Sequence, residues 1–176
     1  KRMSVLTADL MVEAMPLIES AGHGSEHERW ERLKVMDQAD RPGEASYARM
    51  LTKQDHQIDW SDSALTIHRK VMALYPNAVT LWNDKRLKIQ HCEPLIERLK
   101  DELPADVHPL VGRWPTGGHP PGTVLESVKG IGVVVSTKGC PIMIRSAQLE
   151  GKGRSDGDSL IQQLNATAKQ QFGTFS

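Results

Sequence analysis

Apolar residues recur at helical spacing near the start of the chain, at Leu6, Leu10, Met11, Ala14, Met15 and Ile18. This spacing places them on one helical face, so residues 5–20 are predicted to form an amphipathic helix that ends before Gly22. One helix cannot bury such a face alone. We therefore expect it to pack against a segment upstream of Lys1 or against the later part of the chain.

The stretch from residue 21 to about residue 57 has weaker periodicity, because glycine and proline interrupt many charged residues. Residues 30–36 alternate in character and predict one short strand within this linker. His23 and His27 are four residues apart, but no third metal ligand accompanies them and neighbouring glycines break a helix. We interpret both as solvated loop histidines.

The middle of the chain changes from helical to strand periodicity. Serine and aspartate at positions 61–63 offer N-cap oxygens, and apolar residues follow at helical spacing until Pro76. These features predict a helix over residues 62–74. The period then becomes two, which predicts strands over residues 79–82 and 86–90 joined by a tight turn.

The remainder of the chain is rich in strand signals. Residues 93–102 are predicted to form a short helix. Residues 103–121 contain five prolines and are predicted to form an irregular segment. Three further strands are predicted over residues 122–128, 130–137 and 141–149. We expect the turns that join them to place Gly130 and Gly139 at positive φ. A closing helix follows residues 155–156. Five short strands with a helix before and after predict a small closed or partly open barrel.

Composition and cysteine usage limit the classes of protein. The chain is 39% hydrophobic and 25% charged, as in globular proteins. The longest apolar run, residues 131–135, is far shorter than the roughly 20 residues that span a bilayer. Cys92 and Cys140 lack metal-binding or redox spacing, so we expect reduced structural thiols. The sequence predicts a soluble cytoplasmic protein, and the lysine at position 1 indicates a fragment.

The net charge of zero conceals an uneven distribution. Residues 1–62 contain 8 Lys and Arg against 12 Asp and Glu, whereas residues 66–100 contain 7 against 3 and residues 111–176 contain 7 against 4. Clustered positive charge is typical of a surface that contacts phosphate, although a solvated face is the alternative.

Residues with catalytic potential form no recognisable set. The segment Gly130-Ile131-Gly132 lacks the third glycine of a dinucleotide fingerprint, so we interpret it as a hairpin feature. Asp55 and Asp59 are paired only in sequence, and His68 is interpreted as a packing or RNA-adjacent residue rather than a base. No Ser/His/Asp or Cys/His arrangement has a local signature. We predict no catalytic, cofactor-binding or metal-binding residue in this chain.

Several short segments resemble one known family. They are residues 47–53 (Tyr-Ala-Arg-Met-Leu-Thr-Lys), 58–61 (Ile-Asp-Trp-Ser), 67–69 (Ile-His-Arg), 75–76 (Tyr-Pro) and 85–88 (Lys-Arg-Leu-Lys). In order and spacing they resemble the region that joins the two domains of methionyl-tRNA formyltransferases and enters their C-terminal barrel. Residues 122–125, 130–135 and 149–152 resemble later strands of that barrel, and residues 7–13 resemble the final helix of the catalytic domain.

The resemblance implies an α+β, mainly β fold in three parts. Residues 1–20 would be the last helix of a Rossmann-like catalytic domain, residues 21–60 an interdomain linker, and residues 61–176 an OB-like, tRNA-binding C-terminal barrel. The chain departs from the family at residues 77–79, where Asn-Ala-Val replaces a usual Trp-Pro-Gly, and in a longer segment over 93–121. The family's catalytic Asn, His and Asp match nothing here, so none is transferred.

The resemblance also implies a reaction and partners. The parent enzyme would transfer a formyl group from its co-substrate, 10-formyltetrahydrofolate, to the methionine amino group of initiator methionyl-tRNA, whereas this chain alone would be inactive. We expect a monomeric parent enzyme with no membrane and no metal partner. The predicted tRNA contacts are Lys53, Arg69, Lys70, Lys85, Arg86 and Lys88. For each of them the alternative interpretation is a solvated surface charge.

Two alternatives remain open. A related formyltransferase that acts on an amino-sugar nucleotide shares the Asp-Trp-Ser element, although the basic charge of residues 66–100 favours tRNA. A stand-alone RNA-binding module is the second alternative. It would be favoured if the helix over residues 5–20 packed fully within this chain.

Overall fold

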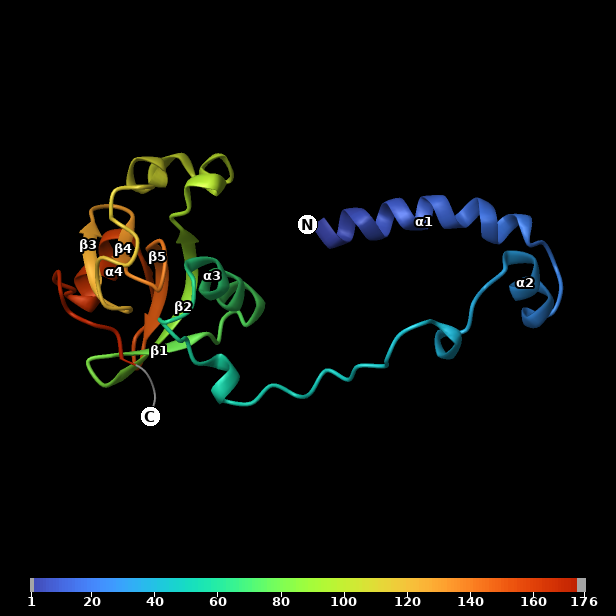
Figure 1. Cartoon of the computed structure of the whole chain (residues 1–176), viewed down its shortest axis with the longest axis horizontal. Helices are drawn as coiled ribbons and strands as arrows, with labels where there is room; N and C mark the ends of the chain where they lie inside the picture. Colours follow the sequence, from blue (N-terminus) through green and yellow to red (C-terminus); the bar gives the residue numbers. More distant parts are fainter. Residues whose placement is uncertain (1, 174–176) are drawn as a thin grey trace. The chain divides into compact units, whose positions relative to one another are not determined.

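The computed structural model describes residues 2–173 and shows two compact units (Figure 1). The first unit ends at Arg49, and the second begins at Met50. The first unit contains the helices α1 (Arg2–Ser20) and α2 (Glu26–Leu33) and the 3-10 turn η1 (Gln38–Asp40). Every strand within the described residues belongs to the second unit.

Helix α1 confirms the predicted amphipathic helix, but its apolar side chains are not buried. Leu10 and Val12, for example, are 63% and 72% exposed. Although α1 has 19 residues, no helix in the described part of the chain combines the length and hydropathy needed to cross a membrane.

Helix α2 shows that the strand predicted over residues 30–36 is wrong. The backbone N–H of Glu28 donates to the Ser25 hydroxyl at 3.3 Å, and the Ser25 N–H donates to the Glu28 carboxylate at 2.8 Å. This capping box satisfies two backbone donors at the start of the helix. The local cap outweighs the weak alternation that predicted a strand. His27 consequently lies on an exposed helix rather than in a loop.

The second unit is built on one antiparallel sheet. Its strands are β1 (Val79–Trp82), β2 (Lys85–Pro94), β3 (Val124–Val128), β4 (Gly132–Val135), β5 (Ile142–Leu149) and β6 (Arg154–Asp156). Within the described residues these six strands follow the order β1-β2-β5-β4-β3, and β6 pairs with β5. The α+β, mainly β class is confirmed. The sheet is compatible with the predicted OB-like barrel, although β6 was not predicted.

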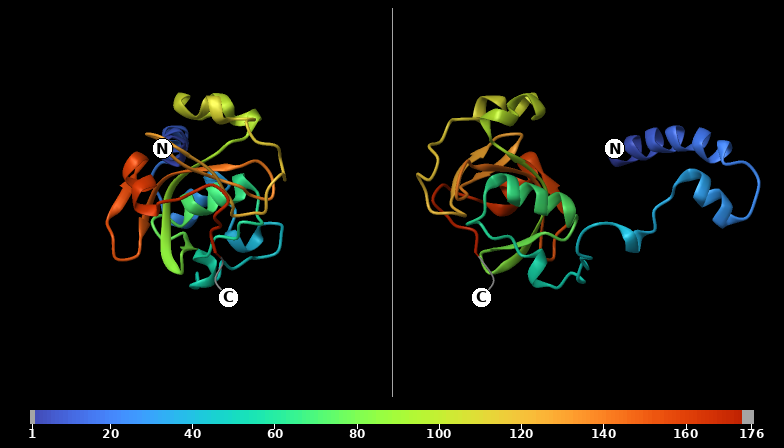
Figure 2. Two further views of the ribbon diagram at one scale, coloured as in Figure 1. Left: turned by 90° about the vertical axis from the view of Figure 1, so that its left-hand side faces the viewer. Right: turned by 45° about the vertical axis from the view of Figure 1, so that its right-hand side comes forward.

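Helices and 3-10 segments flank this sheet. They are η2 (Gln54–His56), α3 (Ala64–Ala73), η3 (Glu97–Glu102), η4 (Ala105–Leu110) and α4 (Gly157–Leu164). The predicted helices over residues 62–74 and after residues 155–156 are confirmed as α3 and α4. Figures 1 and 2 show η3 and η4, in yellow-green, at one end of the strands.

Two predicted turns have different outcomes. Asn83 and Asp84, between β1 and β2, have φ values of 47° and 63°, as a two-residue hairpin turn requires. Gly139 does not adopt the positive φ that we predicted. There the Thr137 hydroxyl donates to the Cys140 carbonyl at 2.7 Å and holds the bend instead.

The last described residues join the two edges of the sheet. Gly173 and Leu81 of β1 exchange backbone hydrogen bonds of 2.9 and 3.3 Å. The N–H of Phe172 donates to the carbonyl of Gly122, next to β3, at 2.9 Å. Because β1 and β3 are the edge strands, residues 170–173 close the sheet upon itself. This closure was not predicted from the sequence.

Aromatic side chains occupy the larger core. The ring centroid of Phe172 lies 4.6 Å from that of Trp82 and 5.2 Å from that of Trp60. Ile58 and Trp60 are each 2% exposed. The second compact unit therefore includes residues 50–60, which the sequence analysis assigned to the linker.

A second, smaller core lies beneath η3 and η4. Its buried members are Leu95, Leu103, Val107, Leu110, Val134 and Met143. The helix predicted over residues 93–102 is wrong, because Glu93 and Pro94 pair with Met143 and Ile142 of β5 and remain extended. Only residues 97–102 turn, and they form 3-10 rather than α-helix.

An ion pair attaches η4 to β5 and gives a testable pH dependence. The Arg145 guanidinium donates to both Asp106 carboxylate oxygens, at 2.7 and 3.0 Å, and holds the pKa of that carboxyl below its usual range. A depressed pKa contributes stability above the unfolded value of about 3.9, and this contribution is lost as pH falls through the folded pKa. We expect Asp106→Asn to lower the free energy of unfolding at pH 7 by less than about 1 kcal/mol. The difference in urea midpoint from the unmodified chain should shrink as pH falls below about 3.9. A difference that stays constant with pH would contradict this account.

Candidate nucleic-acid interface

A basic hollow of about 260 Å³ lies between η2 and the β1–β2 hairpin. The residues that line it are Lys53, His56, Asn77, Val79, Arg86 and Lys88. Among these lining residues three are cations and none is acidic. Concentrated positive charge attracts phosphate groups.

The alternation of β2 explains why two of these cations face outwards. Leu87 and Ile89 are 0% and 1% exposed and point into the larger core. Arg86 and Lys88 therefore occupy the opposite, exposed face of the strand. The ammonium group of Lys88 also donates to the side-chain oxygen of Asn77 at 3.3 Å, which positions both groups at the rim.

A hydrogen-bonded turn presents Lys53 and His56 to the same hollow. The N–H and hydroxyl of Thr52 donate to one Asp55 carboxylate oxygen at 2.6 and 2.8 Å. The His56 Nδ1 atom lies 2.8 Å from the Thr52 carbonyl oxygen. Gln57, which follows His56, forms an isolated bridge with Val79 of β1 and so attaches the turn to the hairpin.

The structure separates the six predicted contact residues. Lys53, which precedes η2, meets Arg86 and Lys88 of β2 at the hollow. The structure does not place Arg69, Lys70 or Lys85 in its lining. Arg69 lines a different groove, of about 440 Å³, together with two glutamates that weaken its attraction for phosphate. His56 and Asn77 were not predicted from the sequence to belong to this site.

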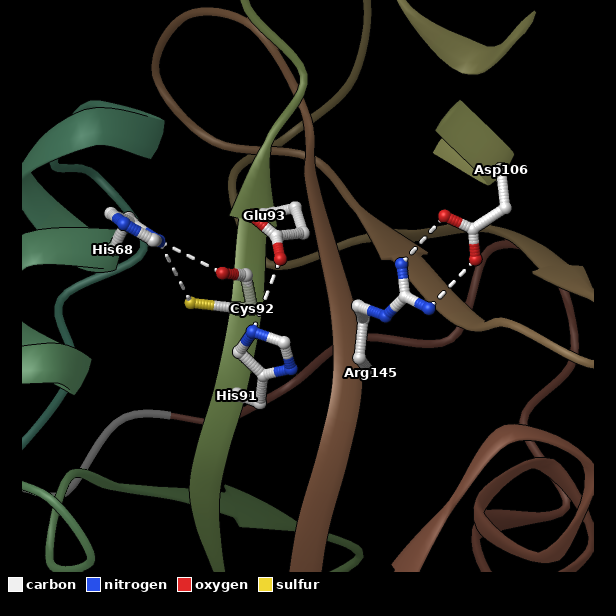
Figure 3. A network of polar contacts seen from close by, with 6 residues as sticks. All are labelled: His68, His91, Cys92, Glu93, Asp106 and Arg145. Carbon is white, nitrogen blue, oxygen red and sulfur yellow. Dashed lines mark hydrogen bonds and ion pairs between the residues drawn. The ribbon is translucent and has the colours of Figure 1, made fainter. Parts of the chain in front are cut away.

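A second group of polar contacts lies on β2 and offers no catalytic set (Figure 3). His91 Nε2 lies 3.1 Å from a Glu93 carboxylate oxygen. Burial raises the pKa of the Cys92 thiol, so this cysteine is not a thiolate nucleophile at neutral pH. His68 Nδ1 lies 2.8 Å from the Cys92 carbonyl oxygen and so links α3 to β2. Within residues 2–173 no group of three side chains is placed to hold a metal ion.

Comparisons with known proteins identify relatives of the chain. Residues 50–165 match the family described as formyl transferase, C-terminal domain. The chain is 85% identical over 176 residues to a methionyl-tRNA formyltransferase from Synechococcus sp. (strain CC9311). This alignment covers 100% of the chain and 52% of that relative. Proteins of the same name from Synechococcus sp. (strain WH7803) and Prochlorococcus marinus (strain MIT 9313) are 61% and 53% identical, over 98% of this chain and 50% of each relative. The chain thus spans about half the length of the curated relatives it matches.

The family match and the structure agree on where the domain starts. The match begins at residue 50, where the second compact unit also begins, and it includes every residue that lines the basic hollow. It also includes all six strands of the described sheet and covers well over half of the chain. The chain therefore belongs to the formyl transferase family, and residues 50–165 form its C-terminal domain.

Proposed function

We propose that this chain is the C-terminal part of a methionyl-tRNA formyltransferase that acts in translation initiation in the cytoplasm. The 85% identity to a protein of that name, across the whole chain, is the observation that supports this most directly. In the proposed reaction the formyl group of 10-formyltetrahydrofolate passes to the methionine amino group of initiator methionyl-tRNA. We expect the parent enzyme to act as a monomer.

The chemistry is assigned to the half of the relatives that this chain does not span. Formyl transfer to an amine needs a base for the attacking nitrogen and hydrogen-bond donors for the developing oxyanion. The described histidines and Cys92 are engaged with neighbouring groups or scattered over the surface, so they do not converge on one reacting centre. We therefore expect this chain to be inactive by itself.

The basic hollow is the part of the chain that we assign to tRNA binding. Lys53, Arg86 and Lys88 would contact the phosphates, whereas Arg69, Lys70 and Lys85 do not line the hollow. Phosphate contacts fix the position of a nucleic acid without reading its sequence. We therefore expect this domain to bind tRNA through its backbone, with selectivity for the initiator residing elsewhere in the enzyme.

Two triple variants that lose the same charge test this assignment. One replaces Lys53, Arg86 and Lys88 with alanine, and the other replaces Arg69, Lys70 and Lys85. Affinity for initiator tRNA is measured between about 50 and 200 mM salt. We expect the slope of log affinity against log salt to flatten by about 2 to 3 in the first variant and by less than about 1 in the second. The reason is that each lost phosphate contact reduces the number of counterions released.

Each outcome of this experiment has a defined meaning. Equal changes in the two variants would show that overall charge, rather than the hollow, governs affinity. Unchanged affinity and slope in both would overturn the tRNA-binding role of this domain. A similar affinity for an elongator tRNA would support contacts to the backbone.

Two alternative functions stay open. A stand-alone RNA-binding module would bury the apolar face of α1 within this chain, and the first compact unit does not cover that face by itself, since Leu6 and Met11 are 50% and 53% exposed. The amino-sugar alternative has no specific observation in its favour, because the relatives named above are all methionyl-tRNA formyltransferases.

A further inference from the structure

The basic hollow contains one ionisable side chain that is not a permanent cation, His56. Its Nδ1 atom lies 2.8 Å from the Thr52 carbonyl oxygen. A carbonyl oxygen can only accept a hydrogen bond, so Nδ1 carries the hydrogen. In the neutral ring the other nitrogen, Nε2, is then an acceptor.

The other side chains of the hollow differ from His56 in their hydrogen bonds. Lysine and arginine side chains only donate hydrogen bonds. The side-chain oxygen of Asn77 already accepts from Lys88 at 3.3 Å. Within the described residues the Nε2 atom of His56 has no hydrogen-bond partner. Among the side-chain acceptors that line the hollow, Nε2 of His56 is therefore the one that makes no hydrogen bond within the described residues.

An ionised phosphodiester has only acceptor oxygens, so a phosphate alone does not satisfy Nε2. RNA has a donor close to every phosphate, the ribose 2′-hydroxyl, which DNA lacks. We propose, building on the tRNA-binding function above, that the basic hollow binds a ribose–phosphate unit of RNA and that Nε2 of His56 accepts a hydrogen bond from its 2′-hydroxyl.

The geometry of η2 suits this role. Thr52 makes two hydrogen bonds to Asp55 and one to the His56 ring, so the ring is held before the ligand arrives. A preformed acceptor costs less conformational entropy on binding than a mobile one. The volume of about 260 Å³ is slightly below that of typical small-molecule sites, roughly 300 Å³ upwards, and suits a single sugar–phosphate unit.

The test compares a short stem-loop RNA with the same stem-loop carrying 2′-fluorine in place of every 2′-hydroxyl. Fluorine keeps the sugar conformation of RNA but removes the donor. The dissociation constants of the 176-residue chain and of His56→Ala are measured with both ligands. We expect the unmodified chain to prefer RNA by about three- to tenfold, the scale of one hydrogen bond. His56→Ala should lose this preference by weakening RNA binding alone.

Two control variants separate the hydrogen bond from other effects. Lys88→Ala should weaken binding of both ligands by the same factor, because both carry the same phosphates. His56→Gln, whose amide oxygen is an acceptor, should recover part of the preference. Circular dichroism verifies that each variant is folded.

The outcomes distinguish this inference from the proposed function. If the unmodified chain binds both ligands equally, or if His56→Ala weakens both by the same factor, the 2′-hydroxyl contact is overturned while RNA binding stands. If the unmodified chain binds neither ligand at low salt, the proposed function fails and this inference fails with it.

Discussion

Replacing Gly132 with alanine is expected to lower the free energy of unfolding of the second compact unit by roughly 3–5 kcal/mol. A β-carbon at this position would lie 2.0 Å from the carbonyl oxygen of Ile144 and 3.2 Å from the α-carbon of Arg145. Both atoms belong to the backbone of β5, so no side-chain rotation relieves the overlap. Gly132 also has a φ of 152°, which an alanine adopts only with strain. The strands β4 and β5 would have to separate at the centre of the sheet.

A matched substitution shows whether the close approach is the cause. Gly153 has no positive φ, and a β-carbon there meets no atom within 4 Å. Gly153→Ala should change stability by no more than about 0.5 kcal/mol. Urea unfolding followed by near-ultraviolet circular dichroism measures both variants. If Gly132→Ala shifts the midpoint no further than Gly153→Ala, β4 and β5 do not approach as closely as described.

Elements with strong local patterns were predictable from the sequence. The helix over residues 5–20, the helix after residues 61–63 and the hairpin around residues 83–84 all have regular periodicity and defined caps or turns. The failures have identifiable causes. Helix α2 depends on a capping box at Ser25 that we overlooked, and residues 93–94 are extended because β5 pairs with them. Pairing with a distant strand leaves little signal in the local sequence.

The candidate site was predictable to a similar extent. The sequence predicted a strand of period two over residues 86–90, and the structure places Arg86 and Lys88 on its exposed face. His56 was not predicted, because its place at the hollow depends on the bridge between Gln57 and Val79, which are distant in the sequence. The charged residues on α3 look equally suitable in the sequence, and only the fold separates Arg69 from the hollow.

Replacing Phe172 with alanine is expected to lower the free energy of unfolding by roughly 3–5 kcal/mol, the scale of a buried aromatic side chain. Phe172 is 5% exposed and contacts the rings of both Trp60 and Trp82. It lies on the segment that joins the β1 and β3 edges, so the substitution opens a cavity where the sheet closes. Water would then reach the two indoles, and their fluorescence should shift to longer wavelength. Urea unfolding and the emission maximum measure the two effects.

The neighbouring residue separates side-chain packing from backbone pairing. Gln171 forms the bridge with Thr123 through its backbone, while its exposed side chain donates one hydrogen bond of 3.2 Å to the Thr123 hydroxyl. Gln171→Ala should therefore cost only about 0.5–1.5 kcal/mol. Equal losses in the two variants would mean that the segment is held by backbone hydrogen bonds alone. A much larger loss for Phe172→Ala would mean that aromatic packing closes the sheet. The basic hollow would then depend on a residue far from it in sequence, because Trp82 ends the strand β1 that forms one of its walls.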